Sequence, residues 1–435
     1  MKDKILKLVR AHARRVHAPV PFVSGHTFIP YAGQTFDEAE VTAGVSAMLE
    51  KWITLGHEGK LFEQELADYI GMEASVLTNS GSSANLLAAS ILTSHKNSER
   101  GRLLPGDEII TAAAGFPTTV FPILQCGAVP VFIDSDPRTG NVMPSELEKA
   151  LSPRTKAVMI AHVLGNPFDV AAVLAFCRKH DLWLIEDNCD AAGSLYDGKR
   201  TGSFGHISTQ SFYPPHHMTM GEGGAVNVCS QKFRTLAESF RDWGRDCWCA
   251  CGCDNTCRNR YNWQLGELPE GYDHKYIYSH VGYNLKPLDI QAAIGREQLK
   301  KLPGFVAARR KNWQTLRDGL ADLSHAFDFM EPQPNSEPSW FGFMLLLKDS
   351  FSRTDLARHL DEHRIGNRML FGGNLVRQPV FCQLKKDRPS AFRVVGDLAG
   401  ADRLMNDALF LGVYPGLTDE MLAYMVQIVR EWVAK

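Results

Sequence analysis

The chain lacks the long apolar segments that membrane proteins need. A membrane-spanning helix takes about 18 or more uncharged apolar residues in a row, and no such run occurs in the sequence. Residues 1–21 are basic, but they do not contain the apolar core of a secretory signal. We therefore expect a cytoplasmic protein that makes no membrane contact.

The sequence has no excess of positive or negative charge. It also shows no internal repeat and no low-complexity segment. The 47 Lys and Arg residues nearly balance the 49 Asp and Glu residues. Proteins that bind nucleic acids or anionic membranes usually carry a basic excess. No nucleic-acid partner is therefore expected, and small metabolites are the better candidates for ligands.

Short apolar runs bounded by Gly, Pro and Asp alternate with helical patterns from about residue 61 onwards. They lie at residues 108–110, 129–133, 157–160 and 182–185. Their length suits buried parallel strands, and apolar residues between them recur at helical spacing. The pattern predicts an α/β fold that binds ligands at the carboxyl ends of its strands. With 435 residues, 44% of them hydrophobic, the chain is long enough for a large domain and a smaller one.

The stretch 211–225 carries an unusual turn. Its sequence is Ser-Phe-Tyr-Pro-Pro-His-His-Met-Thr-Met-Gly-Glu-Gly-Gly-Ala. A short β run ends at Tyr213, two prolines cannot continue a ladder of hydrogen bonds, and glycines free the backbone before strand character resumes. Such a turn holds side chains at the edge of a sheet.

This stretch resembles the cofactor-lysine segment of the sugar aminotransferases, a vitamin-B6-dependent family of fold type I. That segment reads Ser-Phe-x-Pro-x-Lys-Asn, followed by Gly-[Glu/Asp]-Gly-Gly, and His216 stands here in the place of the lysine. An imidazole cannot form a Schiff base, although it can move protons. The substitution is typical of the nucleotide-sugar 3-dehydratases. The resemblance thus implies that pyridoxamine 5'-phosphate (PMP, the amino form of pyridoxal phosphate, PLP) is held without a covalent link, with His216 as the catalytic base.

The resemblance covers roughly residue 36 to the C-terminus and implies the domain organisation. A mostly parallel central sheet is expected in a large cofactor-binding domain at 61–302. A smaller α+β C-terminal domain is expected at 303–435, where 340–347 resembles a strand and 355–360 a helix. Residues 1–60, with a helical stretch at 36–52, are expected to pack on the small domain.

The motif at 78–85, Thr-Asn-Ser-Gly-Ser-Ser-Ala-Asn, passes from a strand end through glycine into a helix. Free N–H groups and the dipole at a helix N-terminus favour phosphate, but an ordinary serine N-cap explains the motif equally well. The resemblance assigns the cofactor phosphate to the amides of Ser82 and Ser83, and to Ser211.

Asp187 ends an apolar run in the motif Glu-Asp-Asn-Cys-Asp at 186–190. A carboxylate there can pair with a protonated pyridine nitrogen, or it can simply cap the next helix. The resemblance favours the first role. Asp190 stands where the family has His or Gln, which indicates chemistry other than amino transfer at this part of the cofactor site. Phe116, within Gly-Phe-Pro-Thr-Thr, would stack on the pyridine ring by the same resemblance.

Further residues follow from the resemblance or from their charge. Asn284 matches an asparagine that one subunit lends to its neighbour's phosphate site, which implies a homodimer. His217 replaces an asparagine of the family, and its role stays open. Arg368 and Arg377 flank a glycine-rich loop and could meet the diphosphate of a substrate, although surface arginines are common.

Five of the ten cysteines fall between residues 247 and 257. In a reducing compartment this density indicates a metal or a cluster rather than disulfides. The spacing of Cys189, Cys247, Cys249 and Cys257 matches the iron–sulfur ligands of the 3-dehydratases and implies a 2Fe-2S cluster. A zinc site is chemically possible with the same residues. Cys251 or Cys253 could replace one of these ligands.

The function that the resemblance implies is 3-dehydration of an NDP-4-keto-6-deoxyhexose, with CDP as the expected nucleotide. It would serve 3,6-dideoxyhexose biosynthesis, for a surface polysaccharide such as lipopolysaccharide or for a glycosylated natural product. An NADH-dependent flavin and iron–sulfur reductase, or a ferredoxin-type donor, would supply electrons.

Two alternatives stay open. The first is a cluster-free PLP- or PMP-dependent sugar dehydratase or aminotransferase whose cysteines hold structural zinc. The second is a non-catalytic, cluster-bearing regulatory protein. The presence of Asp187, Ser211 and Asn284 argues against the second, because such a protein has no need of cofactor contacts.

Overall fold

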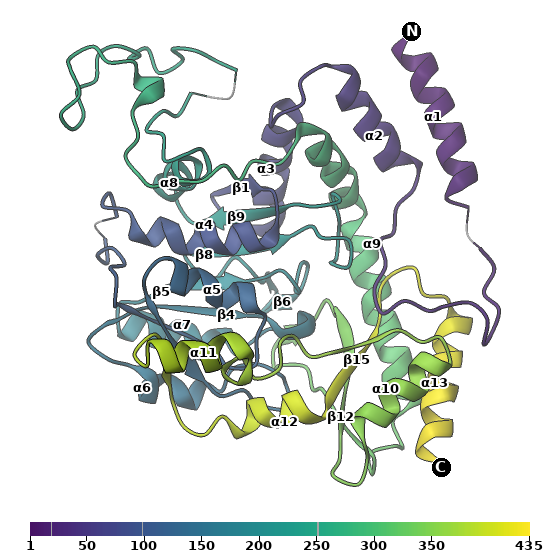
Figure 1. The fold of residues 1–435 in the computed structure, drawn as a ribbon. Helices are drawn as coiled ribbons and strands as arrows, with labels where there is room; N and C mark the ends of the chain where they lie inside the picture. The colour runs from purple at the N-terminus through teal and green to yellow at the C-terminus, as the bar shows by residue number, and fades with distance from the viewer. Residues whose placement is uncertain (19, 98, 250–251) are drawn as a thin grey trace.

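The computed structural model describes residues 1–18, 20–97, 99–249 and 252–435. A large mixed sheet forms its centre and a smaller antiparallel sheet lies beside the C-terminus (Figure 1). Within the described ranges, no helix is long and apolar enough to cross a membrane.

The central sheet has eight strands in the order β1-β9-β8-β5-β4-β2-β3-β14. Their bounds are β1 Ala74–Thr78, β2 Glu108–Ala112, β3 Val129–Ile133, β4 Thr155–Ala161, β5 Trp183–Asp187, β8 Ile207–Ser211, β9 Gly224–Val228 and β14 Arg393–Val394. Pairing is parallel from β8 to β14, whereas β9 is antiparallel to both β8 and β1. The predicted α/β fold with a mostly parallel sheet is therefore confirmed.

Helices cover this sheet, and their apolar residues form its core. They are α3 His57–Ile70, α4 Gly81–Thr93, α5 Pro117–Gln125, α6 Leu147–Ala150, α7 Val170–Lys179 and α8 Gln231–Arg241, with the 3-10 turns Pro144–Glu146 and Val163–Gly165. On α4 the predicted apolar face, which includes Leu87 and Ile91, is fully buried. Parallel strands buried on both faces need no polar alternation, which explains their continuous apolar runs.

The C-terminal part is built on a four-stranded antiparallel sheet, β10-β12-β15-β13. Its strands are β10 Phe327–Phe329, β12 Gly342–Leu347, β13 Asn367–Met369 and β15 Ala408–Gly412. Its helices are α10 Arg353–Glu362, α11 Pro379–Asp387, α12 Ala399–Asp407 and α13 Asp419–Val433, with a 3-10 turn at Leu375–Arg377. A small sheet has the order β11-β6-β7, in which the middle strand β6, Leu195–Tyr196, pairs with β11, Ser336–Glu337, on one side and with β7, Lys199–Arg200, on the other.

The long helix α9, Asp289–Gly319, extends from the end of the central sheet to the C-terminal part of the fold (Figure 1). It crosses residue 302, where the division into large and small domains was expected, so the two parts share one helix. That division remains a prediction.

The N-terminal segment contributes α1, Lys2–Val16, and α2, Glu38–Leu49. The buried Glu40 of α2 accepts hydrogen bonds from Gln298 and Lys301 of α9. Further along, Ile29 forms a bridge with Ile365, and Phe22 packs against Tyr424 of α13. This segment therefore contacts both α9 and the C-terminal part.

Candidate active site

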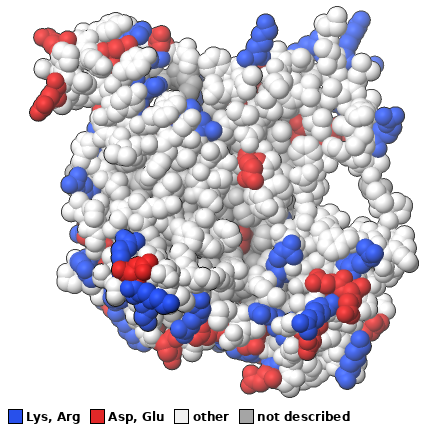
Figure 2. All heavy atoms as spheres, in the orientation of Figure 1, with Lys and Arg blue, Asp and Glu red and all other residues white. Residues whose placement is uncertain are grey.

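A cavity of about 440 Å³ opens at the carboxyl ends of β5 and β8. The residues that line it are Tyr31, Ser80, Gly81, Ser82, Asn85, Phe116, Thr118, Thr119, Ala161, Leu164, Asp187, Cys189, Asp190, Ser211, Tyr213, Pro215, His216, Glu222, Phe341, Arg368, Met369, Phe371 and Phe410. Its position is the one expected for ligands of a parallel α/β sheet, and its volume suits a small molecule. In Figure 2, most charged side chains lie around the edge of the visible face. The middle of this face is largely uncharged apart from a few acidic groups.

One end of the cavity is the N-terminus of α4. Ser80 caps this helix, because its side chain accepts a hydrogen bond from the Ser83 amide at 3.0 Å. A Cβ at Gly81 would lie only 2.4 Å from the Cβ of Ser211, so glycine lets the helix end approach this serine. Ser82 and Ser211 line the cavity, whereas the Ser83 amide is already used by the cap. The N–H groups and hydroxyls at this end suit a phosphate.

Asp187 ends β5 and is held by three hydrogen bonds. Its Oδ2 accepts from Asn85 Nδ2 at 2.8 Å and from Thr119 Oγ1 at 2.7 Å, and its Oδ1 accepts from the Cys189 amide at 3.2 Å. Only 5% of the residue is exposed. A buried carboxylate fixed in this way can pair with a protonated pyridine nitrogen at the cavity wall.

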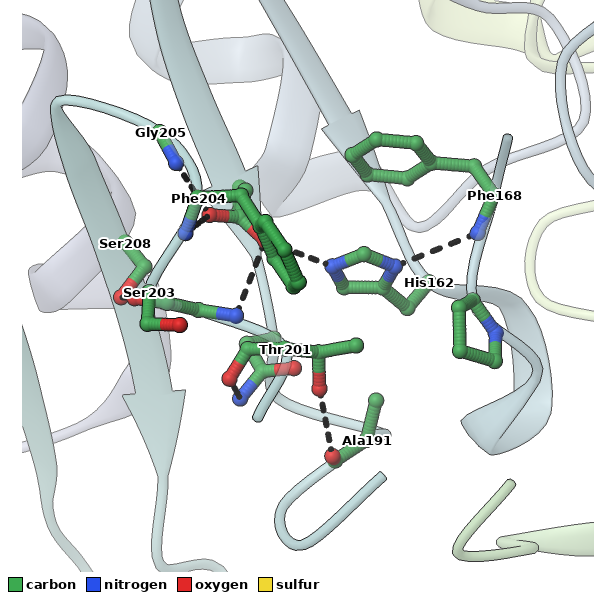
Figure 3. A network of polar contacts seen from close by, with 12 residues as sticks. His162, Phe168, Ala191, Thr201, Ser203, Phe204, Gly205 and Ser208 are labelled. Atoms are coloured by element: carbon green, nitrogen blue, oxygen red, sulfur yellow. Dashed lines mark hydrogen bonds and ion pairs between the residues drawn. The ribbon is translucent and has the colours of Figure 1, made fainter. Parts of the chain in front are cut away.

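A second buried network supports the end of the same strand. Glu186, which is fully buried, accepts hydrogen bonds from the amides of Gly202 and Phe204, both at 2.8 Å, and from that of Gly205 at 2.5 Å. Its Oε2 also lies 3.0 Å from Nε2 of His162, whose ring stacks on Phe168 (Figure 3). The His162 amide in turn donates to the Asp187 carbonyl at 3.1 Å. These contacts fix the backbone from which Asp187 projects.

His216 lies on the turn after β8, with its ring in the cavity wall. Its Nε2 is 3.4 Å from Asp190 Oδ1, and its ring packs edge-on against Phe341 and Tyr213. The Nδ1 atom of His216 and the Oδ2 atom of Asp190 are buried and have no partner among the described residues. Two buried polar atoms of this pair thus have no hydrogen-bond partner in the described part of the chain, which is uncommon and marks the pair as a candidate for function.

No lysine is among the described residues that line the cavity. An imidazole thus occupies the turn where the resembling family has its cofactor lysine. The donors at α4, the carboxylate of Asp187 and the unpartnered atoms of His216 and Asp190 fit PMP bound without a covalent link.

His217 does not line this cavity. Its Nε2 donates to the Ser339 carbonyl at 2.7 Å, and the residue is only 2% exposed. Burial, followed by the nearby charge of Arg309, lowers the pKa of His217 well below its ordinary value. The hydrogen bond ties the turn to the Ser339 segment, and the functional role of His217 stays open.

The far wall of the cavity is aromatic. Phe116 is 50% exposed and meets Phe371 edge-on, with 6.5 Å between ring centroids. Arg368 lines the cavity with its guanidinium 4.0 Å from the ring centre of Tyr31. Arg377 instead pairs with Asp402 at 2.8 Å and does not line the cavity. Of the two arginines singled out from the sequence, the structure brings only Arg368 to the site.

Asn284 is exposed and lies outside the cavity, on a segment whose Leu285 carbonyl accepts a hydrogen bond from the Asn79 amide next to α4. An exposed asparagine beside the phosphate end is compatible with donation to a second subunit. Its role in a homodimer remains a prediction.

The cysteine segment lies beyond α8, away from the sheet (Figure 1). Burial opposes ionisation of the Cys249 thiol. Hydrogen bonds from Thr256, the Cys257 amide and the thiols of Cys257 and Cys247 nevertheless lower its pKa to about 7. Cys247, Cys249 and Cys257, three of the four predicted ligands, are therefore neighbours. Of the two possible replacement ligands, Cys253 is exposed and Cys251 lies outside the described residues.

Cys189, the fourth predicted ligand, lines the cofactor cavity instead. Burial, and after it the charges of Asp187 and Asp190, raise the pKa of its thiol well above the ordinary value. In the part of the chain that the structure describes, no three His, Cys, Asp or Glu side chains form a group ready to hold a metal ion. As they lie here, these cysteines do not make a complete cluster site, and the 2Fe-2S cluster remains a prediction.

Sequence reasoning missed the residues that support the predicted ones. Asn85 and Thr119 orient Asp187, and Tyr31 and Phe341 come from segments far away in the chain. Asn85 offered a signal, since it is a polar residue on the buried face of α4. Nothing local in the sequence marks Tyr31 or Phe341, because their proximity arises from the packing of the C-terminal part.

Comparison with known proteins gives a consistent result. The chain matches the model of the DegT/DnrJ/EryC1/StrS aminotransferase family over residues 35–430. It is 49% identical over 434 residues to the lipopolysaccharide biosynthesis protein RfbH of Salmonella typhimurium, which covers 99% of this chain and 98% of that protein. It is 48% identical over 436 residues to dTDP-4-dehydro-2,6-dideoxy-D-glucose 3-dehydratase of Saccharopolyspora spinosa, with 100% and 92% covered.

Among solved structures, the chain resembles E. coli GDP-4-keto-6-deoxy-D-mannose-3-dehydratase with bound hydrated PLP. The TM-score is 0.81 at 29% sequence identity, and the match covers 93% of this chain and 100% of that one.

Proposed function

The chain belongs to the DegT/DnrJ/EryC1/StrS aminotransferase family, and from this premise we propose that it is a nucleotide-sugar 3-dehydratase of deoxysugar biosynthesis that uses PMP. One observation carries the proposal. His216 stands in the cavity at the cofactor-lysine position, and no lysine is found among the described residues of the cavity wall. An enzyme of this family without that lysine cannot hold its cofactor covalently between turnovers.

The cavity offers a partner for each part of PMP. The α4 end with Ser82 and Ser211 would hold the phosphate, Asp187 would pair with the pyridine nitrogen, and Phe116 would cover the ring. When bound, PMP supplies a primary amine that can condense with a keto group and a ring that accepts electrons.

His216 is the proton-transfer group. Its imidazole can take a proton from the C4' carbon of the cofactor, and Asp190 at 3.4 Å stabilises the imidazolium that results. The imidazolium can pass its proton to the C3 hydroxyl of the sugar, which then leaves as water. The buried ring of Phe341 packs edge-on against the imidazole and shields that side of it from solvent.

The substrate would be a 4-keto-6-deoxyhexose carried on a nucleoside diphosphate. Arg368 is the arginine at the cavity and can meet the diphosphate, while the aromatic wall suits a sugar or base. The relatives named above act, by their names, on dTDP- and GDP-linked sugars. CDP as the nucleotide, and a 3,6-dideoxyhexose as the end product, are our proposal for this chain.

Replacing the C3 hydroxyl by hydrogen needs two electrons in addition to the loss of water. We propose an NADH-dependent reductase or a ferredoxin-type donor as their source, and a 2Fe-2S cluster at Cys189, Cys247, Cys249 and Cys257 as their entry point. The spacing of these cysteines in the sequence supports the cluster. The described side chains do not form a ready metal site, so no catalytic step is assigned to the cluster.

An anaerobic assay tests the proposal. The protein is mixed with PMP, a reductase with NADH, and either CDP- or dTDP-4-keto-6-deoxyglucose, and the sugar product is analysed by mass spectrometry. A product lacking the C3 oxygen supports the 3-dehydratase. A 4-amino sugar formed without water loss would instead identify an aminotransferase, and the absence of any sugar product would leave the regulatory alternative.

A further inference from the structure

Arg309 is a fully buried cation on α9, only 1% exposed. Its guanidinium makes no ion pair with a described carboxylate, and all of its hydrogen bonds go to backbone carbonyls. Nη2 donates to the His216 carbonyl at 3.2 Å, and Nη1 donates to those of Trp340 at 3.3 Å and Phe341 at 3.5 Å.

Burying a charge without a carboxylate partner is unfavourable. Burial lowers the pKa of the Arg309 guanidinium to about 9, an effect that the negative charge of Asp190 partly offsets. The Nε atom is buried and has no partner among the described residues. A methionine would fill the same space at lower cost, so the position of this arginine calls for a reason beyond packing.

The carbonyls that Arg309 binds belong to two separate segments. His216 lies on the turn after β8, whereas Trp340 and Phe341 lead into β12 of the C-terminal sheet. The ring of Phe341 packs edge-on against the imidazole of His216, with 5.5 Å between centroids. The Arg309 guanidinium therefore binds the backbone of His216 and also the backbone of Phe341, whose ring packs against the His216 imidazole.

A second contact joins the same two segments. His217 donates from Nε2 to the Ser339 carbonyl, one residue before Trp340. Arg309 adds a planar group with several donors, which can hold carbonyls in a fixed relative orientation as a single imidazole cannot.

From these contacts we infer that Arg309 is a positioning residue for His216, which holds the base-bearing turn and the Phe341 segment in register so that the imidazole faces Asp190. The inference rests on the proposed role of His216 as the base. The inference deepens that proposal because it names the group that keeps the base in place. Arg309 does this although it does not line the cavity.

Three variants test the inference. Arg309→Met removes the donors and the charge while filling the space, and Arg309→Lys keeps the charge and part of the donor capacity. Arg310→Met is the matched control. Arg310 is the next residue of α9 and binds Glu337 and the Pro338 carbonyl of the same connecting segment, but it does not contact His216.

The first measurement is steady-state dehydration with PMP and the keto-sugar nucleotide. Arg309→Met is expected to lower kcat by about 10- to 100-fold, because a displacement of about 1 Å at a catalytic group has effects of this size. KM should stay within about twofold, since Arg309 touches no substrate. Arg309→Lys should recover a substantial part of kcat, and Arg310→Met should match the wild type.

The second measurement uses the cofactor-free protein and does not depend on activity. Hydrogen–deuterium exchange of the peptide covering 212–220 should become faster in Arg309→Met but not in Arg310→Met. Unchanged kcat and exchange in Arg309→Met would overturn the inference. If the wild type performs no dehydration, the proposed function fails, and the exchange comparison still decides whether Arg309 holds the turn.

Discussion

The Nε2 atom of His216 lies 3.4 Å from Oδ1 of Asp190, and both side chains line the same cavity. One comes from the turn after β8 and the other from the turn after β5, two strands that are parallel neighbours in the central sheet. The carboxyl ends of such strands meet at one edge, so the two groups are brought together by the sheet itself. A carboxylate at this distance stabilises the positive charge of an imidazole that has taken up a proton.

Replacement of His216 by lysine should change the way in which the cofactor is held. In His216→Lys, a primary amine enters the cavity beside Asp190, where it can capture the aldehyde form of the cofactor. Dehydration should fall by at least about 100-fold, because the general base is lost. PLP should then stay with the protein during gel filtration. His216→Asn serves as the control, and it should lose dehydration without gaining tight PLP retention. Unchanged turnover in His216→Lys would refute the assigned role of the imidazole.

Asp187→Asn should weaken PMP binding. The substitution keeps the size of the side chain but removes the charge proposed to pair with the pyridine nitrogen, and a charged hydrogen bond is worth about 1.5–3 kcal/mol. The Kd for PMP, measured by fluorescence titration, should rise by about 10- to 100-fold. Asn85 and Thr119 bind the same carboxylate from behind, so Thr119→Val should produce a smaller change in the same direction. A Kd for Asp187→Asn equal to that of the wild type would exclude this carboxylate as the pyridine partner.

Arg368 and Arg377 form a matched pair for testing substrate binding. Arg368 lines the cavity, whereas Arg377 is paired with Asp402 outside it. Arg368→Met should raise KM for the nucleotide sugar by about tenfold with little effect on kcat, because a charge contact to the diphosphate acts equally in the ground state and the transition state. Steady-state kinetics of Arg377→Met should resemble the wild type. Equal effects of the two substitutions would remove Arg368 from the substrate site.

The cysteine segment should bind iron when the protein is purified without oxygen. Iron and acid-labile sulfide should be present in equal amounts, and Cys249→Ser should lower both. Cys382→Ser is a suitable control, because Cys382 is an exposed cysteine on α11 in a different part of the fold. Zinc in place of iron would favour the cluster-free alternative.

The sequence was most informative where the structure is regular. The run 129–133 coincides with β3, and the buried face of α4 follows the predicted helical spacing, since burial on both sides of a parallel sheet leaves a strong apolar signal. The expected strand at 340–347 begins two residues late, at Gly342, because Trp340 and Phe341 turn toward α9 and the cavity instead.

The candidate site was predictable only in part. Residues that stand in a local motif, such as Asp187 and His216, could be found from the motif. Arg309, Tyr31 and Phe341 could not, because their contacts with the site arise when segments distant in the chain pack together. Cys189 was grouped with the other cysteines from spacing, and the structure adds that it lines the cavity; its role as a cluster ligand remains a prediction.

Borohydride trapping tests the central claim most directly. The wild-type protein is saturated with PLP, reduced with borohydride and digested, and its peptides are mapped by mass spectrometry. If His216 replaces the anchoring lysine, no lysine should carry a pyridoxyl group at stoichiometric yield, although PMP still binds and supports dehydration. A stoichiometric pyridoxyl adduct on any lysine of the wild type would contradict the account.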